Sequence, residues 1–315
     1  MGEIPIWEMK AIDRKRYFVV CCNCWGGLRP APFLFVKNSC NRQENLLKCC
    51  VSILESRVTI MEIQFLLDAG DMPIPCVLSE PDSGIVRRVV LGVHGLGGSS
   101  MDAVQAGIAE EMAQFRYATL RFDFPAHGEN TAGGDGLCLE DCRKTLLAVA
   151  DFVRQGYPLL EDLCIFASGF GAYVTLICLE EILDMPGKVK LVVQTPSLRM
   201  DRTLLNMIHL SPETFRVMDR YTLRVERPFD VTYAFYQELC AYNALETYPI
   251  PMLILHGEKD DYIPMEDIQN FHRINEKSEL AIIPGTSHRF LEEGAWDMVL
   301  DLTRDWFEFE QVLLL

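Results

Sequence analysis

The segment Cys164–Val174 reads Cys-Ile-Phe-Ala-Ser-Gly-Phe-Gly-Ala-Tyr-Val, an apolar run that passes through small residues into a helix-forming stretch. This order predicts a strand, a sharp turn and a helix. So tight a turn needs small residues two positions before and two positions after its apex. With Gly169 as the apex these residues are Ala167 and Gly171, whereas two phenylalanines would flank an apex at Ser168. Steric fit therefore places the apex at Gly169.

The apex of such a turn is where a hydrolytic enzyme carries its nucleophile, in the pattern G-x-S-x-G. Gly169 tolerates the strained backbone of an apex, which often has a positive φ. It has no hydroxyl group, so we expect the turn to form without a nucleophile. The nearby hydroxyls belong to Ser99, Ser100, Ser168 and Ser287, and none of them is at the apex.

Length and composition limit the number of domains and the classes of partner that the chain can have. The chain has 315 residues, of which 49% are hydrophobic and 10% aromatic, enough for one large α/β domain or two small ones. The formal net charge of −16 argues against nucleic acids and anionic membrane surfaces as partners. The sequence contains no run of about 18 apolar residues, so we expect no transmembrane helix.

The N-terminal segment, residues 1–60, differs from the remainder of the chain. It holds 9 of the 29 lysines and arginines, 5 of the 45 acidic residues and six of the twelve cysteines. It shows no clear amphipathic period, and a second methionine, Met61, opens the first well-formed strand pattern. We expect residues 1–60 to be a poorly structured N-terminal extension or a non-native start, and residues 61–315 to form the domain.

This N-terminal segment predicts neither a secretion signal nor a metal site. Arg14–Arg16 precede an apolar stretch, but Asn23 interrupts that stretch and acidic residues precede the basic ones, unlike a signal peptide. Cys21 and Cys24 form one CxxC, without the second pair that a zinc site needs. Idle thiols fit a reducing compartment, so we expect a cytoplasmic protein with no metal and no organic cofactor.

From Met61 onward, strand patterns alternate with helical patterns. Strands are expected at Ile63–Asp68, Ile74–Glu80, Arg88–Val93, Tyr117–Phe122, Leu163–Ala167, Val189–Gln194, Pro251–Leu255 and Leu280–Ile283. Helices are expected at Ala103–Phe115, Leu139–Val153, Ala172–Leu183, Met265–Ile274 and Trp296–Phe309. This alternation predicts an α/β fold with a mostly parallel eight-stranded sheet, helices on both faces and an antiparallel first pair of strands. Ligands of such sheets bind beyond the carboxyl ends of the strands.

One segment interrupts the alternation. Residues 196–248 separate two expected strands and are rich in aromatic residues. An insertion at this point would fold over the strand ends as a small lid, with Phe215, Tyr233 and Tyr236 contacting an apolar substrate. The same side chains could form a small satellite core instead, and the two interpretations are compatible.

Five motifs occur in order along the chain. They are His94-Gly95-Leu96-Gly97-Gly98, Arg121–Glu129, the turn at Gly169, His256–Pro264 and Gly285–Phe290. Each is weak alone, but together they resemble the α/β-hydrolases from about residue 61 to the C-terminus. The closest resemblance is to small-lid esterases and serine-aminopeptidase-like hydrolases, such as feruloyl and cinnamoyl esterases. It implies an α/β-hydrolase fold with catalytic residues in the order Ser…Asp…His.

The resemblance implies roles for three positions of the catalytic site. Gly169 stands at the position of the nucleophilic serine, which is therefore absent. Asp260, three residues after Gly257, matches the acid that orients and stabilises the base, and Asp261 is the competing candidate. His288, after the last expected strand, matches the general base.

The resemblance also implies an oxyanion hole, which needs two backbone N–H groups aimed at the developing negative charge. These groups would belong to Leu96 and Phe170. Glycines around Leu96 allow the backbone to approach a ligand closely. His94, His127 and His256 also match family positions, and we interpret them as loop-shaping residues.

Two functions remain open at this point. In the first, the chain is a serine-hydrolase-family protein of carboxylesterase or acyl-hydrolase type that is impaired or inactive because of Gly169. Slow hydrolysis by a water that His288 activates would then be the most it achieves. In the second, it is a non-catalytic protein that holds a small ester or acyl ligand in a lidded pocket. Retention of Asp260 and His288 favours recent loss of activity over an old binding role.

Overall fold

The computed structural model describes residues 60–310 except 71, 83, 132–135 and 226–227, together with the backbone of three short strands nearer the N-terminus. These strands are β1 (Glu8–Lys10), β2 (Tyr17–Cys21) and β3 (Leu34–Lys37). They pair antiparallel with one another, and β3 pairs antiparallel with β4 (Ile60–Asp68). The rest of the expected N-terminal extension lies outside the described residues.

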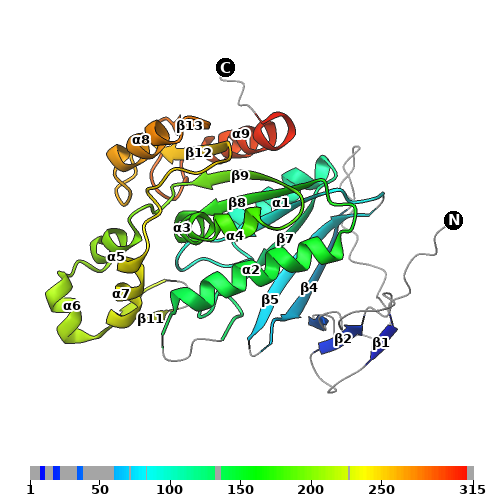
Figure 1. Cartoon of the computed structure of the whole chain (residues 1–315), viewed down its shortest axis with the longest axis horizontal. Helices are drawn as coiled ribbons and strands as arrows, with labels where there is room; N and C mark the ends of the chain where they lie inside the picture. The colour runs from blue at the N-terminus through cyan, green and yellow to red at the C-terminus, as the bar shows by residue number, and fades with distance from the viewer. Residues whose placement is uncertain are drawn as a thin grey trace.

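From β4 onward, eight strands form the main sheet, in the order β4-β5-β7-β6-β8-β9-β12-β13 (Figure 1). The strands after β4 are β5 (Pro73–Pro81), β6 (Arg88–Val93), β7 (Ala118–Phe122), β8 (Asp162–Ser168), β9 (Lys188–Gln194), β12 (Met252–Gly257) and β13 (Ser278–Ile283). The run from β7 to β13 is parallel, while β4 and β5 are antiparallel. The prediction of a mostly parallel eight-stranded sheet is confirmed, and β1–β3 extend its β4 edge.

Helices cover both faces of this sheet, as the alternation predicted. They are α1 (Ala103–Gln114), α2 (Leu139–Gly156), α3 (Gly169–Ile177), α4 (Leu179–Leu183), α8 (Met265–Ile274) and α9 (Ala295–Phe309). Buried side chains of α1 and α9 belong to one hydrophobic cluster, and those of α2, α3 and α8 belong to the other. In the described part of the chain, no helix is long and apolar enough to span a membrane.

Strand β8 shows why a continuous apolar run forms a central strand. Leu163, Ile165 and Ala167 point into the core under α2 and α3, whereas Cys164 and Phe166 point into the core under α1 and α9. All five side chains are fully buried. Burial of a large apolar side chain contributes roughly 1.5–3 kcal/mol, so a strand buried on both faces gains no stability from polar residues.

The strand order brings two loops together at the carboxyl edge of the sheet. Strand β6 lies between β7 and β8. After β6 the chain therefore adds β7 on one side of it and then returns to add β8 on the other side. Val93 at the end of β6 is level with Ala167 near the end of β8. The glycine-rich loop after Val93 and the turn at Gly169 therefore adjoin, at the kind of switch point where α/β sheets bind ligands.

Residues 196–248 lie beyond the carboxyl ends of the strands, beside α3 in Figure 1. The described part of this inserted segment contains α5 (Met200–Ile208), α6 (Pro212–Met218), β10 (Arg220–Leu223), β11 (Phe229–Thr232) and α7 (Tyr233–Ala241). Ser211 and Thr232 cap α6 and α7, because their hydroxyls accept hydrogen bonds from backbone N–H groups three residues ahead.

Candidate active site

The turn after β8 has no intervening loop, because β8 ends at Ser168 and α3 begins at Gly169. Gly169 has φ +50°, in the left-handed region that glycine adopts readily. A Cβ atom at Gly169 would lie 3.9 Å from Cα of Gly95 and 4.0 Å from Oγ of Ser197, which are ordinary contacts. The position therefore has room for a side chain, although its backbone conformation would strain one.

The two flanking positions of the turn have no such room. A Cβ atom at Gly171 would lie 2.3 Å from the carbonyl oxygen of His94 and 2.8 Å from that of Val93. The side chain of Ala167 is fully buried in the sheet. Small residues are thus required on both sides of Gly169, as expected for a turn with its apex at that residue.

An aspartate and a histidine meet at the same edge of the sheet. Asp260 follows β12, and its buried carboxylate accepts hydrogen bonds from the N–H groups of Tyr262 (2.8 Å) and Ile263 (2.9 Å). Its other oxygen accepts a hydrogen bond of 2.8 Å from Nδ1 of His288, which follows β13. Asp261 is exposed, so Asp260 is the carboxylate that pairs with His288.

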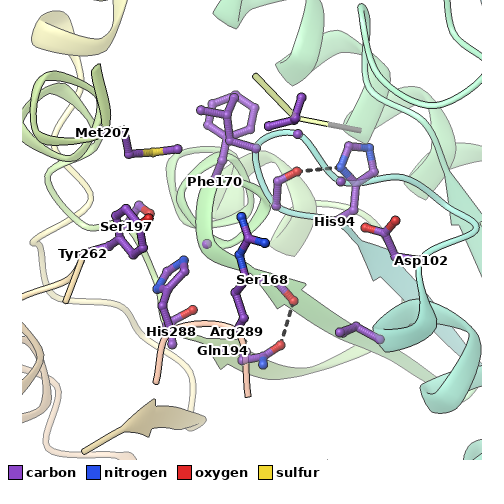
Figure 2. Close-up of a pocket in the computed structure, with 18 of the residues that line it drawn as sticks. His94, Asp102, Ser168, Phe170, Gln194, Ser197, Met207, Tyr262, His288 and Arg289 are labelled. Carbon is purple, nitrogen blue, oxygen red and sulfur yellow. Dashed lines mark hydrogen bonds between the residues drawn. The ribbon is translucent and has the colours of Figure 1, made fainter. Parts of the chain in front are cut away.

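This pairing determines the charge state of the carboxylate. Burial raises the pKa of Asp260, but the hydrogen bond and the charge of His288 lower it, and two backbone N–H groups add to this effect. The net result is a pKa below the ordinary value, so Asp260 is ionised at neutral pH. Because Nδ1 of His288 is engaged, Nε2 is the nitrogen left to exchange a proton with a ligand in the pocket, toward which His288 points (Figure 2).

Two backbone segments beside Gly169 line the pocket. Phe170 lies in the first turn of α3, whose N–H groups have no partner within the helix. Leu96 lies in the loop after β6, where N–H of Gly98 donates to the carbonyl of Gly95 (3.0 Å). Leu96 and Phe170, the two expected oxyanion-hole residues, line one pocket together with His288.

Two buried histidines hold the surrounding loops. His94 donates from Nδ1 to the carbonyl of Gly95 (2.8 Å) and accepts at Nε2 from N–H of Phe124 (3.1 Å). Burial lowers the pKa of His94 to about 4 and that of His127 to about 3. Both rings are therefore neutral at pH 7. Burial also lowers the pKa of His256, whose Nδ1 is 3.8 Å from Asp260.

The pocket has a volume of about 570 Å³ and opens at the carboxyl edge of the sheet (Figure 2). Its floor is formed by the loop after β6, the first turn of α3 and the loops after β9, β12 and β13. The start of α1 and the inserted segment also line it, the latter through Met200, Thr203, Met207, Arg224 and Val225. The volume of the pocket is that of a small-molecule site.

The three aromatic residues expected to contact substrate lie elsewhere in the inserted segment. Phe215 is fully buried, and its ring centroid is 5.9 Å from that of Tyr233 and 6.0 Å from that of Tyr236. The two tyrosine rings also contact each other. None of the three lines the pocket; Phe215 belongs to the main hydrophobic cluster, and Tyr233 and Tyr236 pack against that cluster.

Several pocket residues escaped the sequence-based reasoning. Ser197 is buried after β9, and its N–H donates to the carbonyl of Gly169 (3.2 Å). Arg224 and Arg289 line the pocket from the inserted segment and from the loop after β13. Ser197 and Arg289 each follow a strand of the sheet, and this position in the sequence could have indicated that they line the pocket. Within the residues that the structure describes, no cluster of side chains suited to a metal ion occurs.

A parallel sheet with a sharp strand–helix turn beside an aspartate–histidine pair defines a site of the α/β-hydrolase type. The model of the alpha/beta hydrolase family matches residues 90–302, and the chain belongs to this family. No curated protein sequence matches the chain.

Solved structures share the fold at low sequence identity. Est1E from Butyrivibrio proteoclasticus with bound ferulic acid is 20% identical with a TM-score of 0.67, covering 78% of this chain and 98% of that chain. A putative hydrolase from Agrobacterium vitis S4 is 17% identical with a TM-score of 0.64, covering 78% and 98%. Mouse alpha/beta hydrolase domain-containing protein 10 is 17% identical with a TM-score of 0.63, covering 79% and 99%.

Proposed function

We propose that this chain is an acyl-ester hydrolase of the α/β-hydrolase family in which Gly169 stands in place of the nucleophilic serine. The observation that supports this most is the 2.8 Å hydrogen bond between Asp260 and His288 at the rim of the pocket. Binding alone does not require this acid–base pair. It adjoins a glycine apex at which a side chain would meet no obstruction.

The retained groups could perform every step except the attack. In an intact site His288 takes the proton of the attacking hydroxyl at Nε2, Asp260 stabilises the imidazolium, and the N–H groups of Leu96 and Phe170 stabilise the oxyanion. Without the hydroxyl, a water activated by His288 is the remaining nucleophile. Sites that lack a triad member retain roughly 10³–10⁴-fold catalysis over water, or about 4–5 kcal/mol. We therefore expect impaired, slow hydrolysis.

The ligand that we propose is a small ester or acyl compound, with residues 196–248 acting as a lid. The pocket volume of about 570 Å³ and the ferulic acid bound to Est1E, a structure of the same fold, support this ligand class. The described cysteines are free thiols, which supports a reducing, cytoplasmic setting. We assign no metal and no organic cofactor a part in the reaction.

The test compares hydrolysis of p-nitrophenyl acetate by the natural chain, Gly169→Ser and Gly169→Ala. We expect the natural chain to be near the uncatalysed rate and Gly169→Ser to be at least about 10²–10³-fold faster. Gly169→Ala carries the same Cβ strain without the hydroxyl and should stay slow. Adding His288→Ala to Gly169→Ser should remove the gain.

Rapid hydrolysis of p-nitrophenyl acetate by the natural chain would contradict the proposal. Ser197→Ala then identifies the attacker, since Oγ of Ser197 lies 4.0 Å from the position of a Cβ atom at Gly169. If Ser197→Ala abolishes that activity, the nucleophile is Ser197 and the missing-nucleophile account is wrong.

A non-catalytic binding protein is the second candidate function. The clearance at Gly169 supports it, because the absent side chain leaves extra room for a ligand beside Leu96 and Phe170. Thermal unfolding with hydroxycinnamates and fatty acids distinguishes the two candidates. Strong stabilisation of the natural chain, together with an inert Gly169→Ser variant, would favour the binding protein.

A further inference from the structure

Two arginines, both exposed to solvent, line the pocket. Arg289 directly follows His288, and Figure 2 shows its side chain extending from that loop into the pocket, toward Phe170. Arg224 follows β10 of the inserted segment. Two guanidinium groups in a pocket of about 570 Å³ are a large charge for a site that would hold a neutral ester.

Neither arginine makes an ion pair or a side-chain hydrogen bond with any residue that the structure describes, which distinguishes them from structural arginines of the same domain. Arg121, for example, is buried and bonds Glu62, Ser79 and the backbone of Ser100. The guanidinium groups of Arg224 and Arg289 thus retain donors for a ligand.

One carboxylate among the lining residues offsets part of this charge. Asp102 is the lining carboxylate, and it accepts hydrogen bonds from N–H (2.8 Å) and Oγ (3.0 Å) of Ser99 within its own loop. Asp260 is committed to His288. The described lining residues therefore include two guanidinium groups and one carboxylate, in a chain whose net charge is −16. An excess of positive groups in a cleft favours ligands of negative charge.

The two arginines approach the centre of the pocket from different elements. Val225, the neighbour of Arg224, lies against the loop after β6, because a Cβ atom at Gly97 would be 2.6 Å from Cγ1 of Val225. Arg224 therefore belongs to the segment that packs on the Leu96 side of the pocket, and Arg289 belongs to the loop of His288.

We infer that the pocket selects acyl compounds that carry a carboxylate besides the acyl group, such as half-esters of dicarboxylic acids, and that Arg224 and Arg289 bind this carboxylate. A guanidinium group suits this task, because its planar fork donates two parallel hydrogen bonds to a carboxylate and stays charged at every physiological pH. The inference specifies the substrate class of the proposed function. Binding of the anion itself does not need a nucleophile.

The test measures binding of monomethyl glutarate and dimethyl glutarate to the natural chain by calorimetry. The two compounds share one acyl skeleton and differ in one negative charge. We expect the half-ester to bind at least about tenfold more tightly, and Arg224→Gln or Arg289→Gln to weaken it about tenfold each. The double variant should lose the preference. Lysine at either position should restore part of it, because the charge remains while the fork is lost.

Arg216→Gln is the matched control, because Arg216 is exposed in the same inserted segment and does not line the pocket. It should leave both affinities unchanged. Equal binding of the two esters by the natural chain, or a preference that survives in the double variant, would overturn the inference. Inorganic phosphate that competes as strongly as the half-ester would also overturn it, since the site would then recognise bare charge.

The Gly169→Ser variant separates failure of this inference from failure of the proposed function. Its kcat/KM for mono-p-nitrophenyl glutarate should exceed that for p-nitrophenyl butyrate, and Arg289→Gln should reverse this order by raising KM. A Gly169→Ser variant that is inert toward both esters contradicts the proposed function, while the calorimetric preference still tests the arginines.

Discussion

Gly169 and Gly171 are two positions apart in the turn after β8 and have opposite environments. A Cβ atom at Gly169 would meet nothing closer than 3.9 Å, whereas one at Gly171 would lie 2.3 Å from the carbonyl of His94. Glycine is therefore favoured at position 169 only by the backbone φ of +50°. At position 171 glycine is required because α3 packs closely on the end of β6. The surroundings leave space for a side chain at residue 169 and leave none at residue 171.

We expect Gly171→Ala to lower the free energy of unfolding by about 1–3 kcal/mol, because backbone carbonyls cannot move aside for the added methyl group. Urea unfolding followed by circular dichroism measures the change. Gly156→Ala at the end of α2 is the control, since a Cβ atom there would meet nothing within 4 Å. It should leave stability unchanged or raise it by about 0.4–1 kcal/mol. Equal stability of Gly171→Ala and the natural chain would contradict the packing argument.

The lowered pKa of His127 predicts that the protein loses stability in mild acid. Its pKa is lowered from 6.5 to about 3 by burial, and His94 lies beside it with ring centroids 5.1 Å apart. Between these two pKa values the unfolded chain binds the proton and the folded chain does not, so stability is full above pH 6.5 and falls as pH decreases. At pH 5 the titration of His127 lowers the free energy of unfolding by about 2 kcal/mol.

His127→Phe removes this titration and keeps an aromatic ring beside Phe229. At pH 7 the variant should be less stable by about 1 kcal/mol, because the hydrogen bond to the carbonyl of Pro125 is lost. At pH 5 the order should reverse, with the variant more stable by about 1 kcal/mol, because only the natural chain loses about 2 kcal/mol to protonation of His127 on unfolding. Chemical unfolding at the two pH values measures both differences, and a constant deficit would show that His127 does not titrate as inferred.

At the scale of elements, the strands and the turn could be predicted from sequence because their signals are local. A run buried on both faces, such as β8, is continuous in the sequence, and small residues around Gly169 fix the apex. Asp260 and His288 were predictable because each follows a strand whose carboxyl end meets the same edge. The position of Arg224 in the pocket was not, because the packing of the inserted segment determines which of its faces meets the pocket.

Helix α2 depends on the inserted segment for its N-terminal cap. Cys138 precedes the helix and gives no side-chain cap, but Glu238 of α7 accepts a hydrogen bond of 2.6 Å from N–H of Leu139. A carboxylate at this end also interacts favourably with the helix dipole. Glu238 thus links the inserted segment to the domain that carries the sheet.

We expect Glu238→Ala to lower the free energy of unfolding by about 1–2 kcal/mol, because the first N–H groups of α2 lose their acceptor. Hydrogen exchange should accelerate at the start of α2 and in α7. Glu246→Ala in the same segment is the control, because the Glu246 side chain is exposed. Unchanged exchange in Glu238→Ala would mean that the segment is held by its apolar contacts alone.

At the scale of the whole molecule, the two hydrophobic clusters lie in the domain that begins at β4. Among residues whose side chains the structure describes, every cluster member lies at or beyond Ile63, and β3 pairs its backbone at Leu34–Val36 with Phe65–Leu67 of β4. Removing residues 1–60 deletes this pairing and exposes β4 as an edge strand. An exposed edge is a template for pairing with another chain.

We therefore expect a variant that begins at Met61 to fold with native circular dichroism and with a Tm within about 5 °C of the full chain. Sedimentation velocity should show more self-association than in the full chain, because β4 is uncovered. A variant that begins at residue 34 covers β4 with the four-residue strand β3, which leaves a shorter edge, so it should self-associate less than the Met61 variant if edge exposure is the cause. Failure of the Met61 variant to fold would show that residues 1–60 belong to the domain, since burial within residues 61–310 would then be insufficient.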